Sequence, residues 1–115
     1  MASSCPFCAI VEGESNADIV HESDRLLAFR DTNPQAPVHI LVIPKRHVPS
    51  VRELGDEPAE TVVELVQTAT LIAKQEGIDD GGWRLVANVG RDGHQTVDHL
   101  HFHLLGGRSM GWPPG

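Results

Sequence analysis

The chain has 115 residues and a formal net charge of −7 at pH 7, and 40% of its residues are hydrophobic. This length suits one domain over residues 1–115, with a single core that is mostly aliphatic because the chain has three Phe, two Trp and no Tyr. An acidic protein of this kind lacks the basic stripe that DNA or long RNA requires, although a local group of donors can still bind a small nucleotide.

The sequence contains no apolar run that reaches membrane-spanning length, so we expect no membrane partner. The first four residues, Met-Ala-Ser-Ser, lack the basic and apolar regions of a secretory signal, and we therefore expect a cytoplasmic protein. In that reducing compartment the two cysteines are expected to serve in metal binding or redox chemistry rather than in a structural disulfide.

The pattern of apolar residues predicts a short helix, three strands, a long helix and two more strands. The short helix covers residues 5–12 and is ended by Gly13. The long helix is expected to begin at an acidic cap, Asp56-Glu57, with Pro58 in its first turn, and to end at Gly77. Its apolar stripe consists of Val62, Leu65, Val66, Ala69, Ile72 and Ala73. The strands are expected at residues 19–22, 26–29, 38–43, 83–88 and 99–104, which predicts an α+β fold on an antiparallel sheet.

The last of these strands carries three histidines that alternate with apolar residues: His99-Leu100-His101-Phe102-His103-Leu104. Because side chains alternate along a strand, the three apolar residues are expected to face a core and the three imidazoles the opposite side, about 6.6 Å apart. Two histidines can bind one zinc ion, but the first and third lie too far apart to share it readily. Alternatively, a neutral imidazole such as His101 can attack phosphorus, with His103 beside it.

A turn rich in glycine and polar residues precedes the histidine strand. Gly90, Gly93, Gln95 and Thr96 offer backbone N–H groups and a hydroxyl that can face a phosphate. The same residue types also form ordinary hairpin turns, and only the position of the turn beside the histidines favours phosphate binding.

Cys5 and Cys8 have the spacing of a metal knuckle, but one pair supplies only two ligands, and histidine is the obvious supplement. A redox pair and two idle thiols are the alternatives. The redox interpretation needs a βαβ setting, for which the four residues before Cys5 leave no room.

Residues 99–105 resemble the signature of the histidine-triad (HIT) family of nucleotide-binding proteins, with Gln95-Thr96-Val97 before them and Gly106-Gly107-Arg108 after them. Residues 31–39 and 43–47 are similar to the same family, and the C-terminal residues 112–115, Trp-Pro-Pro-Gly, resemble its HINT branch, the purine nucleoside phosphoramidases. The resemblance implies a HIT-like fold, in which a five-stranded antiparallel sheet carries one long and one short helix. It also implies a homodimer in which two sheets form a continuous ten-stranded sheet.

The resemblance further implies hydrolysis of the P–N bond of purine nucleoside 5′-phosphoramidates, such as AMP-amine or AMP-lysine compounds. His101 is expected to form a nucleotidyl-histidine intermediate that releases the nucleoside monophosphate, with His103 on the phosphate, His39 lining the pocket and no catalytic metal. The residues that the resemblance implies in nucleotide binding are Phe7, Phe29, Asp31, Thr32, Asn88, Gln95, Thr96, Val97, His101 and His103.

For the cysteine pair, the resemblance implies a structural zinc bound by Cys5, Cys8, His47 and His99. The sequence also departs from the family pattern, with His94 where glycine is common and Asp98 where an aromatic residue is common.

Three functions follow as hypotheses: a phosphoramidase, a nucleotide-binding module whose hydrolysis is incidental, and a zinc enzyme with a catalytic metal. Two of the expected site residues also have a purely structural interpretation. Asp31 can cap the end of a strand, and His39 can be an ordinary histidine of the core.

Overall fold

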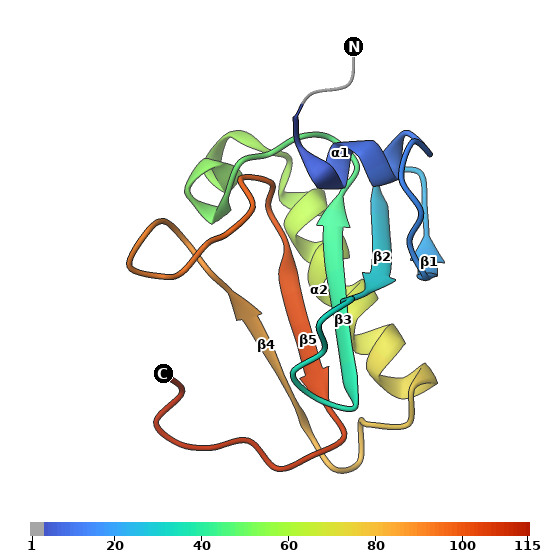
Figure 1. The fold of residues 1–115 in the computed structure, drawn as a ribbon, viewed down its shortest axis with the longest axis vertical. Coiled ribbons are helices and arrows are strands. Elements are labelled where there is room, and N and C mark those ends of the chain that lie inside the picture. The colour runs from blue at the N-terminus through green and yellow to red at the C-terminus, as the bar shows by residue number, and fades with distance from the viewer. Residues whose placement is uncertain (1–3) are drawn as a thin grey trace.

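The computed structural model describes residues 4–115, which form one antiparallel sheet with helices on both of its faces (Figure 1). The strands are β1 (Ile19–Glu22), β2 (Leu26–Arg30), β3 (Val38–Pro44), β4 (Trp83–Ala87) and β5 (Phe102–Gly106), in the spatial order β1-β2-β3-β5-β4. The long helix α2 (Ala59–Gln75) lies behind the sheet in Figure 1, and the short helix α1 (Pro6–Val11) lies across one end of it. The five-stranded antiparallel α+β fold expected from the sequence is therefore confirmed.

Alternation along β2 and β3 divides the buried residues between two cores. Ala28 and Val42 belong to the larger core, which α2 covers with Leu65, Ala69 and Ile72. The adjacent residues on the two strands, Leu27 and Phe29 on β2 and Leu41 and Ile43 on β3, point to the other face. Together with Phe7 of α1 they form a smaller core. The second face is thus covered only in part, by α1, and the rest of it is open to side chains that do chemistry.

The connection between β3 and α2 differs from its predicted form. A 3-10 helix, η1 (Val51–Asp56), occupies residues for which no element was expected, and the Ser50 hydroxyl caps it by accepting from the Arg52 N–H at 3.0 Å. Because η1 takes up Asp56, the predicted acidic cap of α2 is wrong: Pro58 is the N-cap, and no side chain caps this end. Among the described helices of residues 4–115, none is long and apolar enough to cross a membrane.

Of the six residues in the predicted apolar stripe of α2, four are buried, Val62 is half-buried and one is exposed. Leu65, Ala69, Ile72 and Ala73 are buried, but the side chain of Val66 is 41% exposed. Thr61 and Thr68 are buried in its place, since positions i, i+4, i+7 and i+8 face the sheet together.

The histidine strand is shorter than predicted, because β5 begins at Phe102 and residues 99–101 precede it. In the ladder, Val42 pairs with Phe102, so Pro44 would pair with Leu100. Pro44 has no N–H to donate, and the ladder ends before this pair. The predicted facing of the apolar residues is nevertheless confirmed, because Leu100, Phe102 and Leu104 all pack in or against the larger core.

Candidate functional site

The ladder between β3 and β5 brings together histidines that are far apart in sequence. His103 lies opposite Leu41, and His39 is two residues from Leu41 on the same strand. The two imidazoles are therefore diagonal neighbours on the face opposite α2, with ring centroids 5.1 Å apart. His101 continues the alternation just before β5, and its ring centroid lies 5.0 Å from that of His103.

Hydrogen bonds determine which ring nitrogen of His39 and of His103 carries the proton. The Gln35 N–H donates to His39 Nδ1 at 3.0 Å, so the proton of a neutral His39 is on Nε2. This Nε2–H donates to His103 Nδ1 at 2.8 Å, which leaves the proton of His103 on its own Nε2. Asp31 Oδ2 lies 3.4 Å from His39 Nε2 and favours the same arrangement. His103 can therefore donate from Nε2 to an anion beside it.

His101 has the opposite proton arrangement. Its Nδ1 lies 2.7 Å from the carbonyl oxygen of His99, and a carbonyl can only accept. The proton of His101 is therefore on Nδ1, and Nε2 carries a lone pair. The geometry thus pairs a nucleophilic nitrogen on His101 with a donor on its neighbour His103.

Burial keeps two of these imidazoles neutral. The pKa of His103 is lowered to about 4, first by burial and then by the neighbouring His101 and His39, while Asp31 opposes the shift. Burial also lowers the pKa of His39, again against the influence of Asp31. Both rings are therefore uncharged at neutral pH, which preserves the order of protons described above.

Asp31, His39 and His103 are close enough together to hold a metal ion, since their ligand atoms lie within 4.8 Å of one another. The positions of the protons on the His39 and His103 rings oppose metal binding by this cluster. A metal on His39 Nε2 would move the ring proton to Nδ1, where it would face the Gln35 N–H donor. This cluster is therefore better suited to orient a proton than to bind a catalytic zinc.

A pocket of about 270 Å³ is lined by His101 and His103, whereas His39, which was expected to line it, is buried and contacts the pocket only through its hydrogen bond to His103. Eight of the ten residues expected to bind nucleotide line it: Phe7, Phe29, Asp31, Thr32, Thr96, Val97, His101 and His103. Its apolar and hydroxyl-bearing walls and its few convergent polar groups are typical of a small-molecule site.

The other two expected residues, Asn88 and Gln95, do not line this pocket and instead hold the loop beside it. Asn88 Nδ2 donates to the Gly93 carbonyl at 2.7 Å. Gln95 Oε1 accepts from the Gly90 N–H at 3.1 Å, and Gln95 Nε2 donates to the carbonyls of Pro49 and Val97. Both side chains therefore shape the turn that presents the next two residues, Thr96 and Val97.

Five lining residues were not predicted: Ile10, Asn16, Ala17, Arg30 and Leu41. The alternation of β3 could have indicated Leu41, because it shares a face with His39. Asn16 and Ala17 lie in the irregular segment between α1 and β1, where no periodic pattern marks them.

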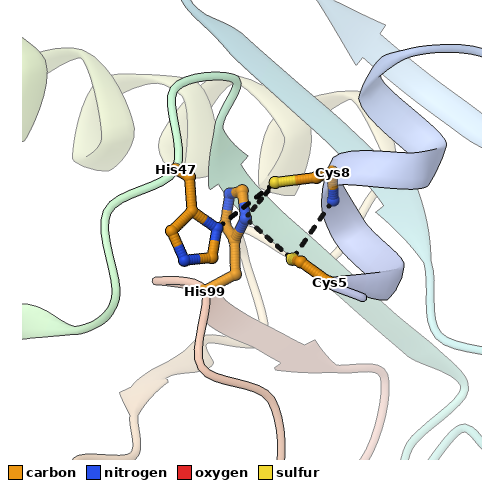
Figure 2. Close-up of side chains that lie close together, drawn as sticks. All are labelled: Cys5, Cys8, His47 and His99. Atoms are coloured by element: carbon orange, nitrogen blue, oxygen red, sulfur yellow. Dashed lines mark hydrogen bonds between the residues drawn. The ribbon is translucent and has the colours of Figure 1, made fainter. Parts of the chain in front are cut away.

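A second cluster joins the two cysteines of the α1 knuckle to His47 and His99 (Figure 2). Cys5 Sγ lies 3.3 Å from His99 Nδ1, and Cys8 Sγ lies 3.2 Å from His47 Nδ1 and 3.6 Å from His99 Nδ1. Tetrahedral zinc, with Zn–S about 2.3 Å and Zn–N about 2.1 Å, separates sulfur from nitrogen by about 3.6 Å. The four side chains thus have the spacing that zinc requires.

The surroundings of His99 also suit a metal. His99 is fully buried, and its Nε2 donates to the Pro44 carbonyl at 2.8 Å, which leaves the lone pair on Nδ1 facing the sulfurs. Such a contact from the distal nitrogen is the usual support of a histidine ligand. Burial lowers the pKa of His99, the Pro44 carbonyl opposes this, and His47 and His101 lower it further. The donor set therefore fits a closed, four-ligand zinc site.

Comparison with known proteins establishes the family. A family model described as "HIT domain" matches residues 12–110, and the chain therefore belongs to the HIT domain family. This result confirms the resemblance found in the sequence.

Two similar proteins have names that state an activity or a ligand. The purine nucleoside phosphoramidase of Escherichia coli (strain K12) is 44% identical over 111 residues, which are 96% of this chain and 93% of that protein. A 14 kDa zinc-binding protein of Zea mays is 46% identical over 111 residues, 95% of this chain and 86% of that protein. Among solved structures, a HIT family hydrolase from Legionella pneumophila Philadelphia 1 superimposes with a TM-score of 0.94 at 46% identity, covering 97% of this chain and 100% of that chain.

The lowered pKa of His103 predicts a loss of stability in mild acid. A base whose pKa falls from 6.5 to about 4 on folding binds fewer protons than in the unfolded chain, so its contribution is present above pH 6.5 and is lost as the pH falls toward 4. We expect His103→Asn to remove up to ~3 kcal/mol of this pH dependence, measured by urea unfolding at several pH values. Parallel pH profiles for the variant and the wild type would contradict the assignment.

Proposed function

We propose that this HIT-family protein is a hydrolase that cleaves the P–N bond of purine nucleoside 5′-phosphoramidates through a nucleotidyl intermediate on His101. The observation that carries the proposal is the hydrogen bond from His101 Nδ1 to the His99 carbonyl, which leaves a lone pair on Nε2 of a ring that lines the pocket. The name of the Escherichia coli relative supports the same reaction class.

In the first step, the nitrogen of the P–N bond takes a proton from solvent, His101 Nε2 forms a bond to phosphorus, and the P–N bond breaks so that the amine leaves in its neutral form. The Nδ1–H bond to the His99 carbonyl supports the positive charge that develops on the ring. His103 donates from Nε2 to the phosphate oxygens or the departing amine. In the second step, water adds to phosphorus and gives one proton to solvent, the bond between phosphorus and His101 breaks, and the nucleoside monophosphate is released.

The pocket also suggests how a nucleotide is held. We assign the ribose hydroxyls to the Asp31 carboxylate, which can accept from both, and the purine to the apolar side chains of Phe29 and Val97. Thr96 supplies a hydroxyl near the phosphate, while Asn88 and Gln95 act by holding the loop in place. Phosphate binding in this scheme relies on imidazole and loop donors and uses no metal.

Replacing the proposed nucleophile tests the reaction. We expect His101→Asn to lower kcat for a fluorogenic adenosine 5′-phosphoramidate by about 10⁴-fold or more, while AMP binding by calorimetry stays nearly unchanged. Intact-mass measurement after rapid mixing should find a nucleotide adduct on the wild type and none on the variant.

The control is His21→Asn on β1, which we expect to keep wild-type turnover. Retained turnover in His101→Asn would refute the nucleophile. Tight AMP binding without turnover in the wild type would instead indicate a binding module, and activity that requires added zinc would indicate a catalytic metal.

We further propose that Cys5, Cys8, His47 and His99 hold a structural zinc ion. Their spacing and the Pro44 contact of His99 support this, as does the name of the Zea mays relative. The ion would tie α1 to the segments that follow β3 and precede β5, and it would supply folding free energy.

Removing one ligand tests the zinc site. The purified wild type should contain about one zinc per chain, and Cys5→Ser should lose most of it and unfold at a lower temperature, because the bound metal stabilises only the folded state. The control, Ser4→Ala, alters the adjacent residue and should keep its metal. Elemental analysis and thermal unfolding give the two readouts, and a wild type purified without chelators that contains no zinc would refute the site.

We also propose that two chains associate through the β4 edge and the neighbouring face of α2, which forms a ten-stranded sheet. Val63 and Val66 share one face of α2 and are 51% and 41% exposed, although both are apolar. β4 is an edge strand whose five residues are all half-buried within the single chain. An exposed apolar patch and an open strand edge are each typical of an interface between copies.

A charge on this patch should separate the copies. We expect sedimentation to give the wild type twice the mass of one chain and Val66→Asp the mass of a single chain, because an aspartate would be buried without a partner. Ile19→Asp is the matched control: this apolar side chain is 47% exposed on β1, at the opposite edge of the sheet, and its replacement should leave the dimer intact.

A further inference from the structure

The metal cluster and the candidate nucleophile share one residue. The ring of His99 points its Nδ1 at the two cysteine sulfurs, and the carbonyl of the same residue accepts from His101 Nδ1 at 2.7 Å. The ring is further held by its Nε2 contact to the Pro44 carbonyl. A displacement of His99 that reaches its backbone would therefore also move the carbonyl that fixes the proton of His101.

Phe7 provides a second connection between the two sites. It lies on α1 between the two cysteines of the knuckle, where Cys5 is the N-cap and its Sγ accepts from the Cys8 N–H (Figure 2). The Phe7 ring makes edge contacts with His99 at 5.9 Å and with His101 at 5.1 Å between centroids. Only 8% of Phe7 is exposed, so most of its side chain is packed inside the protein, where it contacts the two histidines.

We propose that Phe7 and the backbone of His99 are positioning residues for the His101 ring, and that the Cys5–Cys8–His47–His99 cluster holds both of them in place. The catalytic readout of this inference rests on the proposed function, whereas its structural readout does not. A metal ion bound by these ligands would thus act on the reaction from a distance, by fixing the orientation and the proton of His101, and would never touch the substrate.

The first experiment replaces Phe7 by Leu in the full chain. We expect kcat for the adenosine phosphoramidate to fall about tenfold and AMP binding to change less than about twofold, because the ring loses its support while the rest of the pocket remains. Histidine ¹⁵N spectra should show His101 passing from a single Nδ1–H form to a mixture of the two tautomers. The control is Ile72→Val, which loosens the core on the other face of the sheet and should alter neither readout.

The second experiment withdraws the metal from the wild type with a chelator and then restores zinc. We expect the same change in the His101 signals and the same fall in kcat, both reversed by zinc, with AMP affinity nearly constant. An unchanged His101 tautomer after removal of the metal would overturn the proposal. A Phe7→Leu variant that weakens AMP binding but keeps kcat would also overturn it, since Phe7 would then serve the base.

The two proposals fail in different ways. If the zinc-loaded wild type does not hydrolyse phosphoramidates, the proposed function is wrong, and the ¹⁵N spectra still decide whether the metal cluster orders His101. If hydrolysis occurs and the ¹⁵N signals of His101 are the same with and without the metal, the proposed function stands. The proposed effect of the metal cluster on His101 is then refuted.

Discussion

The site depends on one hydrogen bond, from His101 Nδ1 to the carbonyl of His99. An imidazole has two nitrogens, and only the one without a proton can attack. A contact to an obligate acceptor removes this ambiguity without introducing a charge, whereas a carboxylate in the same place would favour the charged ring. The backbone is a suitable source for such an acceptor because its carbonyl cannot titrate.

The early end of the ladder makes this bond possible. Pro44 ends the pairing of β3 with β5, so residues 99–101 lie outside the ladder. The carbonyl of Pro44 then accepts from the His99 ring, and the carbonyl of His99 accepts from the His101 ring. An unbroken strand to residue 99 would have directed those carbonyls toward neighbouring strands. The error in the predicted strand boundary thus coincides with the feature that organises the site.

The sequence could predict which residues meet, but not how their hydrogen bonds are arranged. Period-two alternation correctly placed Leu100, Phe102 and Leu104 against the core, and the resemblance selected most of the residues that line the pocket. The protons on His39 and His103 depend on the Gln35 N–H, a backbone group in a loop that has no sequence signature. Likewise, an amide such as Gln95 can serve a ligand or its own loop with equal chemical ease, and only the fold decides.

The neutral state of the imidazoles also explains how an acidic chain can suit an anionic ligand. Rings bearing permanent charge would attract phosphate strongly, but a protonated His101 has no lone pair with which to attack. Burial keeps His103 and His39 uncharged, so that the site offers oriented N–H donors in place of charges. In the proposed reaction, positive charge arises on His101 only as its bond to phosphorus forms, when the carbonyl of His99 is already in place to accept a hydrogen bond from Nδ1–H. The hydrogen bond between His101 and the His99 carbonyl is then stronger in the transition state than in the substrate complex. This difference is the condition for binding energy to accelerate a chemical step.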